Sequence, residues 1–176
     1  MPAVNDYVNY STQGICQIED IRPIKFQAGS RARDYYVLRP IYQKNALVYV
    51  PTDSEHLLGK MRPVLSPEEI DQIIESVRTQ GIPWIQDRTQ RIARSKEILT
   101  GMDERELLLL ASCLYRRSKE SGKGLSATDT AILKKVESII EQEFSFSLKM
   151  NAQGVGAYIR KRLGLADGND PVPTEN

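Results

Sequence analysis

The chain contains a single tryptophan, Trp84, which stands just before a run of regularly spaced arginines. Pro83 suits the first turn of a helix, because its φ is already helical and its missing N–H is not needed there. We therefore predict that Trp84 lies near a helix N-terminus. The arginines that would share a broad face with its indole are Arg88, Arg91 and Arg94. A flat apolar ring beside such a row can press into a nucleic-acid groove while the guanidinium groups hold the phosphates.

The same segment also fits a purely structural interpretation. In it, a buried tryptophan anchors the core and the arginines form a solvated helix face, since buried aromatics and charged helix faces are both common. On this segment alone the two interpretations stay open, and the rest of the chain has to decide between them.

The sequence contains no recognisable set of catalytic residues. His56 is the sole histidine, and no serine or cysteine motif accompanies it. The loop at 121–126 departs from the phosphate-loop pattern, because Lys123 is followed by glycine and no strand precedes it. Cys16 and Cys113 lie far apart without nearby ligand partners, which indicates small buried thiols and no metal site or disulfide. We therefore expect a protein that is not an enzyme and needs no cofactor.

The composition is that of an ordinary globular protein, with 40% apolar and 27% charged residues. No apolar run is long enough to cross a bilayer and the N-terminus lacks a signal pattern, so we expect a cytoplasmic protein. The net charge is only +1, yet cations gather in residues 116–124 and 147–165. Such local basic patches predict a limited phosphate contact, helped by another partner. For the second patch, a solvated helix is the alternative.

Residues 1–62 have the pattern of short β-strands. Runs rich in β-branched and aromatic residues at 7–10, 15–21, 35–38 and 46–50 are separated by turn residues, and Arg22-Pro23 interrupts the second run. Four or five short strands with tight turns predict a small, strongly bent antiparallel barrel. Such a module has an edge, and an unprotected edge can dock a partner strand.

From residue 66 the pattern is helical. Ser66-Pro67-Glu68-Glu69 forms a capping box with proline at the first helical position. We expect a second helix from Trp84 to Leu99, a third beginning at Asp103, a fourth capped by Ser126, and a short one over 155–163. The result is a bundle of four to five helices over 66–165, followed by a disordered tail at 166–176. The predicted fold class is α+β, with the strands and helices segregated.

The two halves together resemble the CarD/CdnL family of bacterial transcription regulators, over roughly residues 4–148. Residues 4–10 with Gly14 are similar to the family's opening pattern, although Asn5 and Ser11 stand where glycine and proline are usual. Further matches in order are Ile18-Glu19, Tyr35 to Leu38, Val50-Pro51, Arg62, Trp84 with the arginines behind it, Thr100 to Asp103, Leu114 to Arg117, and Leu125-Ser126. It is the ordered series, and no single motif, that is specific.

The resemblance implies a role for each half. The first would be a Tudor-like or SH3-like domain that docks on the β subunit of RNA polymerase, largely by extending a sheet. By position, its contacts would be Ile24, Lys25, Val48, Tyr49 and Val50. The helical half would contact promoter DNA at the upstream edge of the melted bubble, with Trp84 as a wedge in the minor groove and Arg88 and Arg91 near phosphates.

We therefore expect a monomeric, nucleoid-associated regulator that bridges RNA polymerase and promoter DNA and stabilises the open complex. One alternative is a protein-interaction adaptor on RNA polymerase, in which Trp84 belongs to the core and DNA is never touched. Another is a small DNA-acting enzyme, against which the missing catalytic residues argue.

Overall fold

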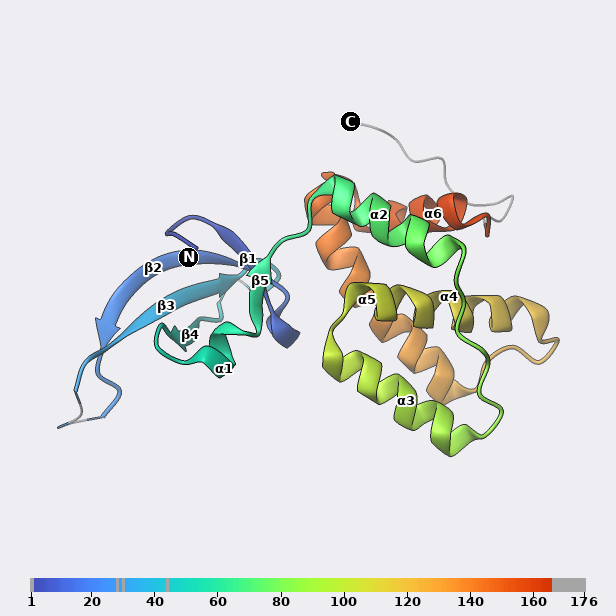
Figure 1. Ribbon diagram of the computed structural model, residues 1–176, viewed down its shortest axis with the longest axis horizontal. Coiled ribbons are helices and arrows are strands. Elements are labelled where there is room, and N and C mark those ends of the chain that lie inside the picture. The colour runs from blue at the N-terminus through green and yellow to red at the C-terminus, as the bar shows by residue number, and fades with distance from the viewer. Residues whose placement is uncertain (1, 28, 30, 44, 166–176) are drawn as a thin grey trace. The chain divides into compact units, whose positions relative to one another are not determined.

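The computed structural model of the chain divides into two compact units, Met1–Val64 and Leu65–Asn176 (Figure 1). It describes residues 2–27, 29, 31–43 and 45–165. The division between the units falls in the interval left between the two predicted domains. The tail predicted at 166–176 lies outside the described residues.

The first unit, here called the β unit, is an antiparallel sheet with the strand order β4-β3-β2-β1-β5. The strands are β1 (Tyr7–Tyr10), β2 (Ile15–Ile24), β3 (Arg33–Pro40), β4 (Val48–Pro51) and β5 (Met61–Pro63). A 3-10 turn (Ser11–Gln13) follows β1, and a short helix, α1 (Glu55–Leu58), precedes β5. Helix α1 was not predicted from the sequence.

The predicted barrel is not confirmed, because the described strands form an open sheet. Among the described residues, β4 and β5 are the two edge strands and do not pair with each other. Strand β5 is only three residues long and ends at Pro63, which lacks the N–H that a continued ladder needs. The segregated α+β class is confirmed, with all the strands in the first unit and every longer helix in the second.

Strand β2 does not end at Arg22-Pro23, as predicted, but continues to Ile24. Beyond Ile18 it pairs only with β3, so Pro23 lies on a sheet edge, where a missing N–H is tolerated. The pairing shifts between Ile18 and Asp20, which marks a β-bulge.

Asn5 occupies the position where the resembled family has glycine. Its φ is 74°, in the left-handed region that asparagine enters more readily than other non-glycine residues. Its N–H donates to the carbonyl oxygen of Ile18 at 2.8 Å. The departure from the family pattern therefore leaves the turn before β1 intact.

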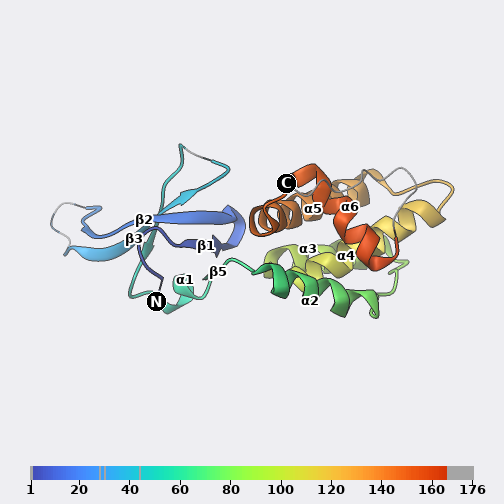
Figure 2. The same cartoon turned by 90° about the horizontal axis from the view of Figure 1, so that it is seen from above.

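The second unit, here called the helical unit, has five helices in its described part, residues 65–165. They are α2 (Pro67–Arg78), α3 (Arg88–Gly101), α4 (Glu104–Glu120), α5 (Ala127–Leu148) and α6 (Ala152–Leu163). The predicted caps are confirmed: Ser66 and Glu69 form the capping box of α2, and Asp103 and Ser126 cap α4 and α5. In Figure 2, α4 runs between α2 on one side and α5 on the other, and it contacts both.

Helix α3 begins later than predicted, at Arg88 and not near Trp84. The reason is the cap: the Asp87 side chain accepts a hydrogen bond from the N–H of Gln90 at 2.8 Å and fixes the first turn there. Residues 81–87 form an irregular connection between α2 and α3. Trp84 therefore lies outside the helix that carries the arginines, so helical spacing does not bring the two together.

The core of the helical unit is formed by aliphatic residues of all five helices together with Phe144. No helix in the described part of the chain combines the length and apolarity needed to cross a membrane.

Candidate interaction surfaces

The open edge of the β unit is the outer side of β4. In an antiparallel sheet, an edge strand presents unpaired N–H and C=O groups to which another strand can add. Because β4 pairs only with β3 among the described strands, its other side is such an edge. Pro51 ends the strand and removes one donor, so the free edge centres on Val48 to Val50.

Beside this edge, three aromatic side chains form a cluster on the outer face of the sheet. The ring of Phe26 meets those of Tyr35 and Tyr49 edge to face, at centroid distances of 5.1 Å and 5.4 Å. Phe26 is 59% exposed, although it is large and apolar. Such a cluster next to a free edge adds side-chain contacts to the backbone pairing that a partner strand would make.

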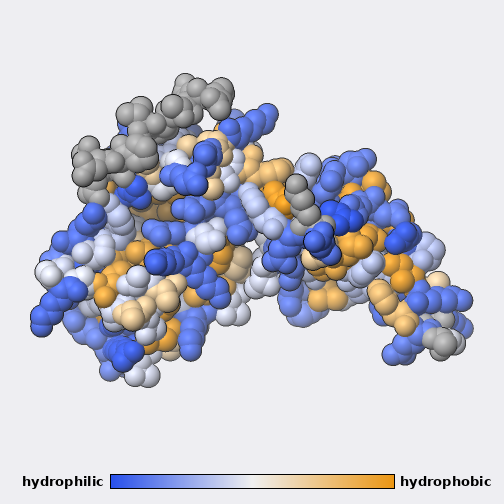
Figure 3. All heavy atoms as spheres, turned by 180° about the vertical axis from the view of Figure 1, so that it is seen from behind, coloured by the Kyte–Doolittle hydropathy of each residue, from blue (hydrophilic) through white to orange (hydrophobic). Residues whose placement is uncertain are grey.

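Exposed apolar side chains are concentrated in the β unit. Among the described residues, the exposed large hydrophobic side chains are Val4, Tyr7, Ile21, Phe26, Tyr42 and Leu47. Figure 3 shows hydrophobic atoms interrupting the hydrophilic surface of this unit. A single exposed hydrophobic residue is ordinary. What indicates an interaction surface is that Leu47, Tyr49 and Phe26 lie on or beside the same sheet edge.

The structure separates the side chains predicted to contact RNA polymerase. Val50 is fully buried and Val48 packs against the same core, so a partner at this edge would meet these two residues through their backbone. Tyr49 points to the opposite face and joins the aromatic cluster, while Ile24 is the last residue of β2 and Lys25 follows it. The alternation of side chains along a strand already predicts this difference, because residues 48 and 50 point to one face of the sheet and residue 49 points to the other.

Phe26 and Tyr35 were not predicted as contact residues from the sequence. Phe26 directly follows a strand, and because a single exposed apolar residue is ordinary, no local pattern marked it as a contact residue. Tyr35 was recognised only as a strand residue, and its neighbour across the sheet became visible only with the register Tyr35↔Pro51.

In the helical unit, Trp84 is partly buried and packs against the core. Two guanidinium groups lie over its ring: the Cζ of Arg91 is 4.3 Å and that of Arg117 is 5.1 Å from the ring centroid. Cation–π contacts of this kind hold the indole in one orientation. The indole is therefore neither sealed in the interior nor free at the surface.

Arg91 is occupied by contacts within the protein. Its Nε and Nη2 donate to the two carboxylate oxygens of Asp129, both at 3.0 Å, and its Nη1 donates to the carbonyl oxygens of Ile85 and Gln86 at 2.8 and 3.2 Å. This network fastens the Trp84 connection to α3 and α5. The guanidinium is thus committed to holding the indole, which argues against the predicted phosphate contact by Arg91.

Burial and hydrogen bonding act in opposite directions on Asp129, whose side chain is only 2% exposed. Burial alone would raise the pKa of this carboxyl, but hydrogen bonds from Arg91 and Ser126 and the charges of Arg91 and Arg88 outweigh it and lower the pKa. The carboxylate therefore stays ionised and keeps Arg91 in place.

The other two predicted arginines have different surroundings. Arg94 donates to the carboxylates of Glu97 and Glu106 at 3.2 and 3.0 Å, so acids largely neutralise it. Arg88 is exposed in the first turn of α3, and its Nη2 donates to the hydroxyl of Thr128 in the first turn of α5 at 3.2 Å.

These contacts bring two helix N-termini and Trp84 to one end of the helical unit. Arg88–Thr128 and Arg91–Asp129 join the start of α3 to the start of α5, and Arg117 links the last turns of α4 to the indole. Figure 1 shows the connection from α2 running past α4 to the end where α3 begins. This end of the unit is here called the Trp84 end; the side chain of Asp87 already caps α3 there, and Asp129 lies in the first turn of α5.

The described residues contain no group of three or more histidine, cysteine or acidic side chains placed to hold a metal ion. Both cysteines are unpaired, and burial raises the pKa of the Cys16 thiol to about 11.

The β unit is an open antiparallel sheet with a free edge and an adjoining aromatic cluster, the kind of module to which a partner strand can add. A comparison with protein families identifies it further: residues 3–65 match the CarD-like/TRCF RID domain. The β unit belongs to this CarD/CdnL-type family of RNA polymerase-interacting domains. The family implies a transcription-related function and an interaction with the RNA polymerase β subunit. A comparison with curated proteins finds no match.

Proposed function

We propose that the protein is a monomeric, nucleoid-associated transcription regulator that docks on the β subunit of RNA polymerase through the edge of β4 and holds promoter DNA at the upstream edge of the bubble with the Trp84 end. The docking half is supported by the RID family match over residues 3–65. The observation that carries the DNA half is the indole of Trp84, partly exposed and held under Arg91 and Arg117 where α3 and α5 begin.

The mechanism follows from the rigidity of the indole. Unstacking a base step costs a few kcal/mol, and an apolar wedge offsets part of that cost only in DNA that is already open. A ligand shifts the equilibrium between closed and open promoter DNA only by the difference between its affinities for these two states. A tryptophan fixed by Arg91 and Arg117 loses little side-chain entropy on insertion, so more of its contact energy favours the open form.

Docking explains how a nearly neutral protein can act on DNA. With a net charge of +1, the chain has little general attraction for a polyanion. A domain bound to polymerase would hold the helical unit near the promoter at high effective concentration, so a weak DNA contact suffices.

The experiment that tests the DNA half is Trp84→Ala, with Lys96→Ala as the matched control on an exposed position of α3. We expect Trp84→Ala to bind polymerase normally but to shorten the open-complex lifetime by roughly tenfold, about 1.4 kcal/mol. The lifetime is measured as the decay of promoter complexes challenged with competitor DNA. An unchanged lifetime, or an equal loss in the control, would contradict the wedge.

One observation favours a second candidate, the adaptor that never touches DNA: Trp84 packs on the core, and Arg91 and Arg94 are paired internally. Acrylamide quenching of tryptophan emission separates the two functions. A wedge becomes protected from quenching when a forked duplex is added, whereas in an adaptor the quenching does not change.

A further inference from the structure

We propose that a cavity between α4, α5 and α6 is a binding site for a small aliphatic amine, whose alkyl chain fills the cavity while its ammonium group lies between the carboxylates of Glu137 and Glu141. This inference goes beyond the proposed function and does not depend on it. The alternative is a packing defect that binds nothing.

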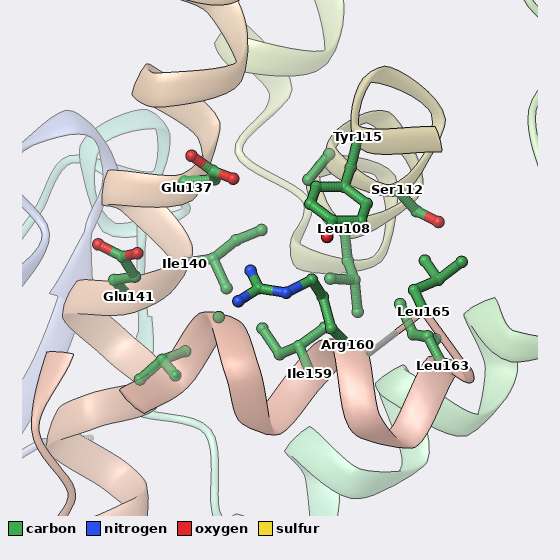
Figure 4. A pocket seen from close by; sticks show the side chains of 13 residues that line it. Leu108, Ser112, Tyr115, Glu137, Ile140, Glu141, Ile159, Arg160, Leu163 and Leu165 are labelled. Atoms are coloured by element: carbon green, nitrogen blue, oxygen red, sulfur yellow. The ribbon is translucent and has the colours of Figure 1, made fainter. Parts of the chain in front are cut away.

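The cavity, here called the α4–α6 cavity, is lined mainly by aliphatic side chains (Figure 4). Leu108 of α4, Ile140 of α5, and Ile159 and Leu163 of α6 line it, and all four are buried. Its volume is about 50 Å³. A group of the size of a water molecule needs roughly 10–15 Å³, so there is room for about four such groups. This is the size of a short alkyl chain, and it is too small for a helix or a strand of a partner protein.

An alkyl chain is the occupant that the aliphatic wall favours. Side chains around an empty cavity lack the van der Waals contacts of a filled core, and the loss of stability grows with the cavity volume. A water molecule in such a place needs two to four polar partners, and aliphatic side chains offer none. A ligand with an apolar arm would therefore recover contacts that the protein alone does not make.

The charged part of the lining favours a cation. The charged side chains among the described residues that line the cavity are Glu137, Glu141 and Arg160, so acids outnumber bases. The two glutamates are four residues apart on α5, which places them on one helix face with their Cβ atoms about 5–6 Å apart. An ammonium group has three donors and no acceptor, so it can donate to both carboxylates. A carboxylate ligand would instead add a third negative charge.

Arg160 leaves the cavity open. Figure 4 shows its guanidinium between Tyr115 of α4 and the two glutamates, and its Cζ lies 5.3 Å from the centroid of the Tyr115 ring. A Cβ added to Gly156 would lie 3.0 Å from Nη1 of Arg160, so the glycine leaves the space that the guanidinium occupies. The volume of about 50 Å³ is what remains free with the guanidinium in this place.

The ionisation of the two carboxyls links binding to pH. Burial raises the pKa of both Glu137 and Glu141 above the ordinary value of 4.5, and the charge of Arg160 offsets only part of this effect. The other groups around them are Lys134, which lowers the pKa of Glu137, and Tyr115, which lines the same cavity. An ammonium group binds the ionised carboxylates, so its affinity should rise as the pH rises through their pKa values.

The test uses the full chain and n-butylammonium chloride, with binding followed by the NMR shifts of methyl groups. The shifts should change at Ile140, Val155 and Ile159, which line the cavity. We expect n-butylammonium to bind at least about tenfold more tightly than methylammonium, which lacks the alkyl chain. It should also bind more tightly than n-butanol, which lacks the charge, and than butyrate, which has the opposite charge.

The variant E137Q/E141Q tests the carboxylates. Its affinity for n-butylammonium should be lower by about tenfold or more, because charge-assisted hydrogen bonds are lost. The pH dependence of binding between about pH 4 and about pH 8 should disappear with them. The matched control E68Q/E75Q removes the same charge from exposed positions of α2 and should change neither. Circular dichroism checks that both variants fold, and the series of probes on the unmodified chain decides the question even if one does not.

Three outcomes would overturn the proposal. Binding of butyrate or n-butanol as tight as that of n-butylammonium would exclude an amine site. Equal losses of affinity in E137Q/E141Q and E68Q/E75Q would mean that general charge attracts the probe. If n-butylammonium does not shift the methyl groups that line the cavity at millimolar concentration, the cavity is only a packing defect. None of these measurements involves DNA or polymerase, so each leaves the proposed function untouched.

Discussion

At the scale of single residues, the pair Arg91–Asp129 decides what Trp84 can do. A bidentate ion pair between side chains that are 11% and 2% exposed is worth little as a net stabilising contact, but removing one partner leaves the other charge buried and unpaired. Its function here is positional, because the same guanidinium holds two carbonyl groups of the Trp84 connection. Local order at the indole should therefore depend on the ionisation of Asp129.

Asp129→Asn tests this dependence. We expect the free energy of unfolding of the helical unit to fall by about 3–5 kcal/mol, because Arg91 loses its counter-charge. Tryptophan emission should shift to the red as the connection loosens, and chemical denaturation followed by this emission measures both effects. Glu97→Gln, which removes an exposed partner of Arg94, is the control and should change stability by less than about 1 kcal/mol.

The same carboxyl gives a pH dependence of defined sign. The pKa of Asp129 is lower in the folded protein than its ordinary value of 3.8, so the folded state favours the ionised form. Its contribution to stability is complete above the unfolded pKa and is lost as the pH falls through the folded pKa. Stability should therefore fall below about pH 4, and the part due to this residue should be missing in Asp129→Asn.

At the scale of the elements, the sheet of the β unit has two faces of opposite character. Residues of β3 and β4 that alternate inward fill the core, while Phe26, Tyr35 and Tyr49 gather outside, beside the free edge. An interface usually draws most of its binding energy from a few aromatic anchors. If β4 accepts a strand of polymerase, the outer cluster should be the anchor.

Phe26→Ser should weaken binding to polymerase by roughly tenfold or more while leaving the fold intact, since an exposed ring contributes little to the core. Ile21→Ser is the matched control: Ile21 is 38% exposed but pairs with Tyr36 and so belongs to the other face. Affinity for the β subunit can be measured by biolayer interferometry and folding by circular dichroism. Equal losses in both variants would argue against an anchor on the outer face.

The elements also show what could be predicted from sequence. The helix caps at Ser66, Asp103 and Ser126 were predictable because a capping side chain acts within one turn of its own backbone. The start of α3 was misplaced because Pro83 and Asp87 are both good starting signals, and the choice depends on long-range contacts of the connection.

The candidate site could be predicted only in part, for the same reason. Spacing along the chain indicated Trp84 and its arginines, but the partners of those arginines come from elsewhere in the sequence: Asp129, Thr128 and Glu106. The cluster of Phe26, Tyr35 and Tyr49 likewise depends on the register of two strand pairs, which no local pattern contains. Interactions within one helical turn could be predicted from the sequence, whereas interactions between helices or between strands could not.

At the scale of the whole molecule, the proposed function requires that one unit docks while the other acts, joined by a short connection. The connection is fastened at its helical end. The N–H of Leu65 donates to Oε1 of the buried Glu143 at 3.0 Å, and the hydroxyl of Ser147 donates to the carbonyl oxygen of Leu65 at 2.5 Å. The segment free to vary in length therefore ends before Leu65, between β5 and this anchor.

Lengthening that segment tests the division of labour. Inserting a flexible Gly/Ser stretch between Val64 and Leu65 leaves the Leu65 anchor and both cores in place, so polymerase affinity should not change. The effective concentration of the helical unit at the promoter should fall roughly as the −3/2 power of the linker length, and the effect on open-complex lifetime should fall with it. Two insertions of different length give the trend, and the chain with Trp84→Ala should show no trend because its wedge is absent. If the lifetime effect survives a long insertion unchanged, the units do not act through tethering, and the helical unit must have enough affinity for open promoter DNA by itself.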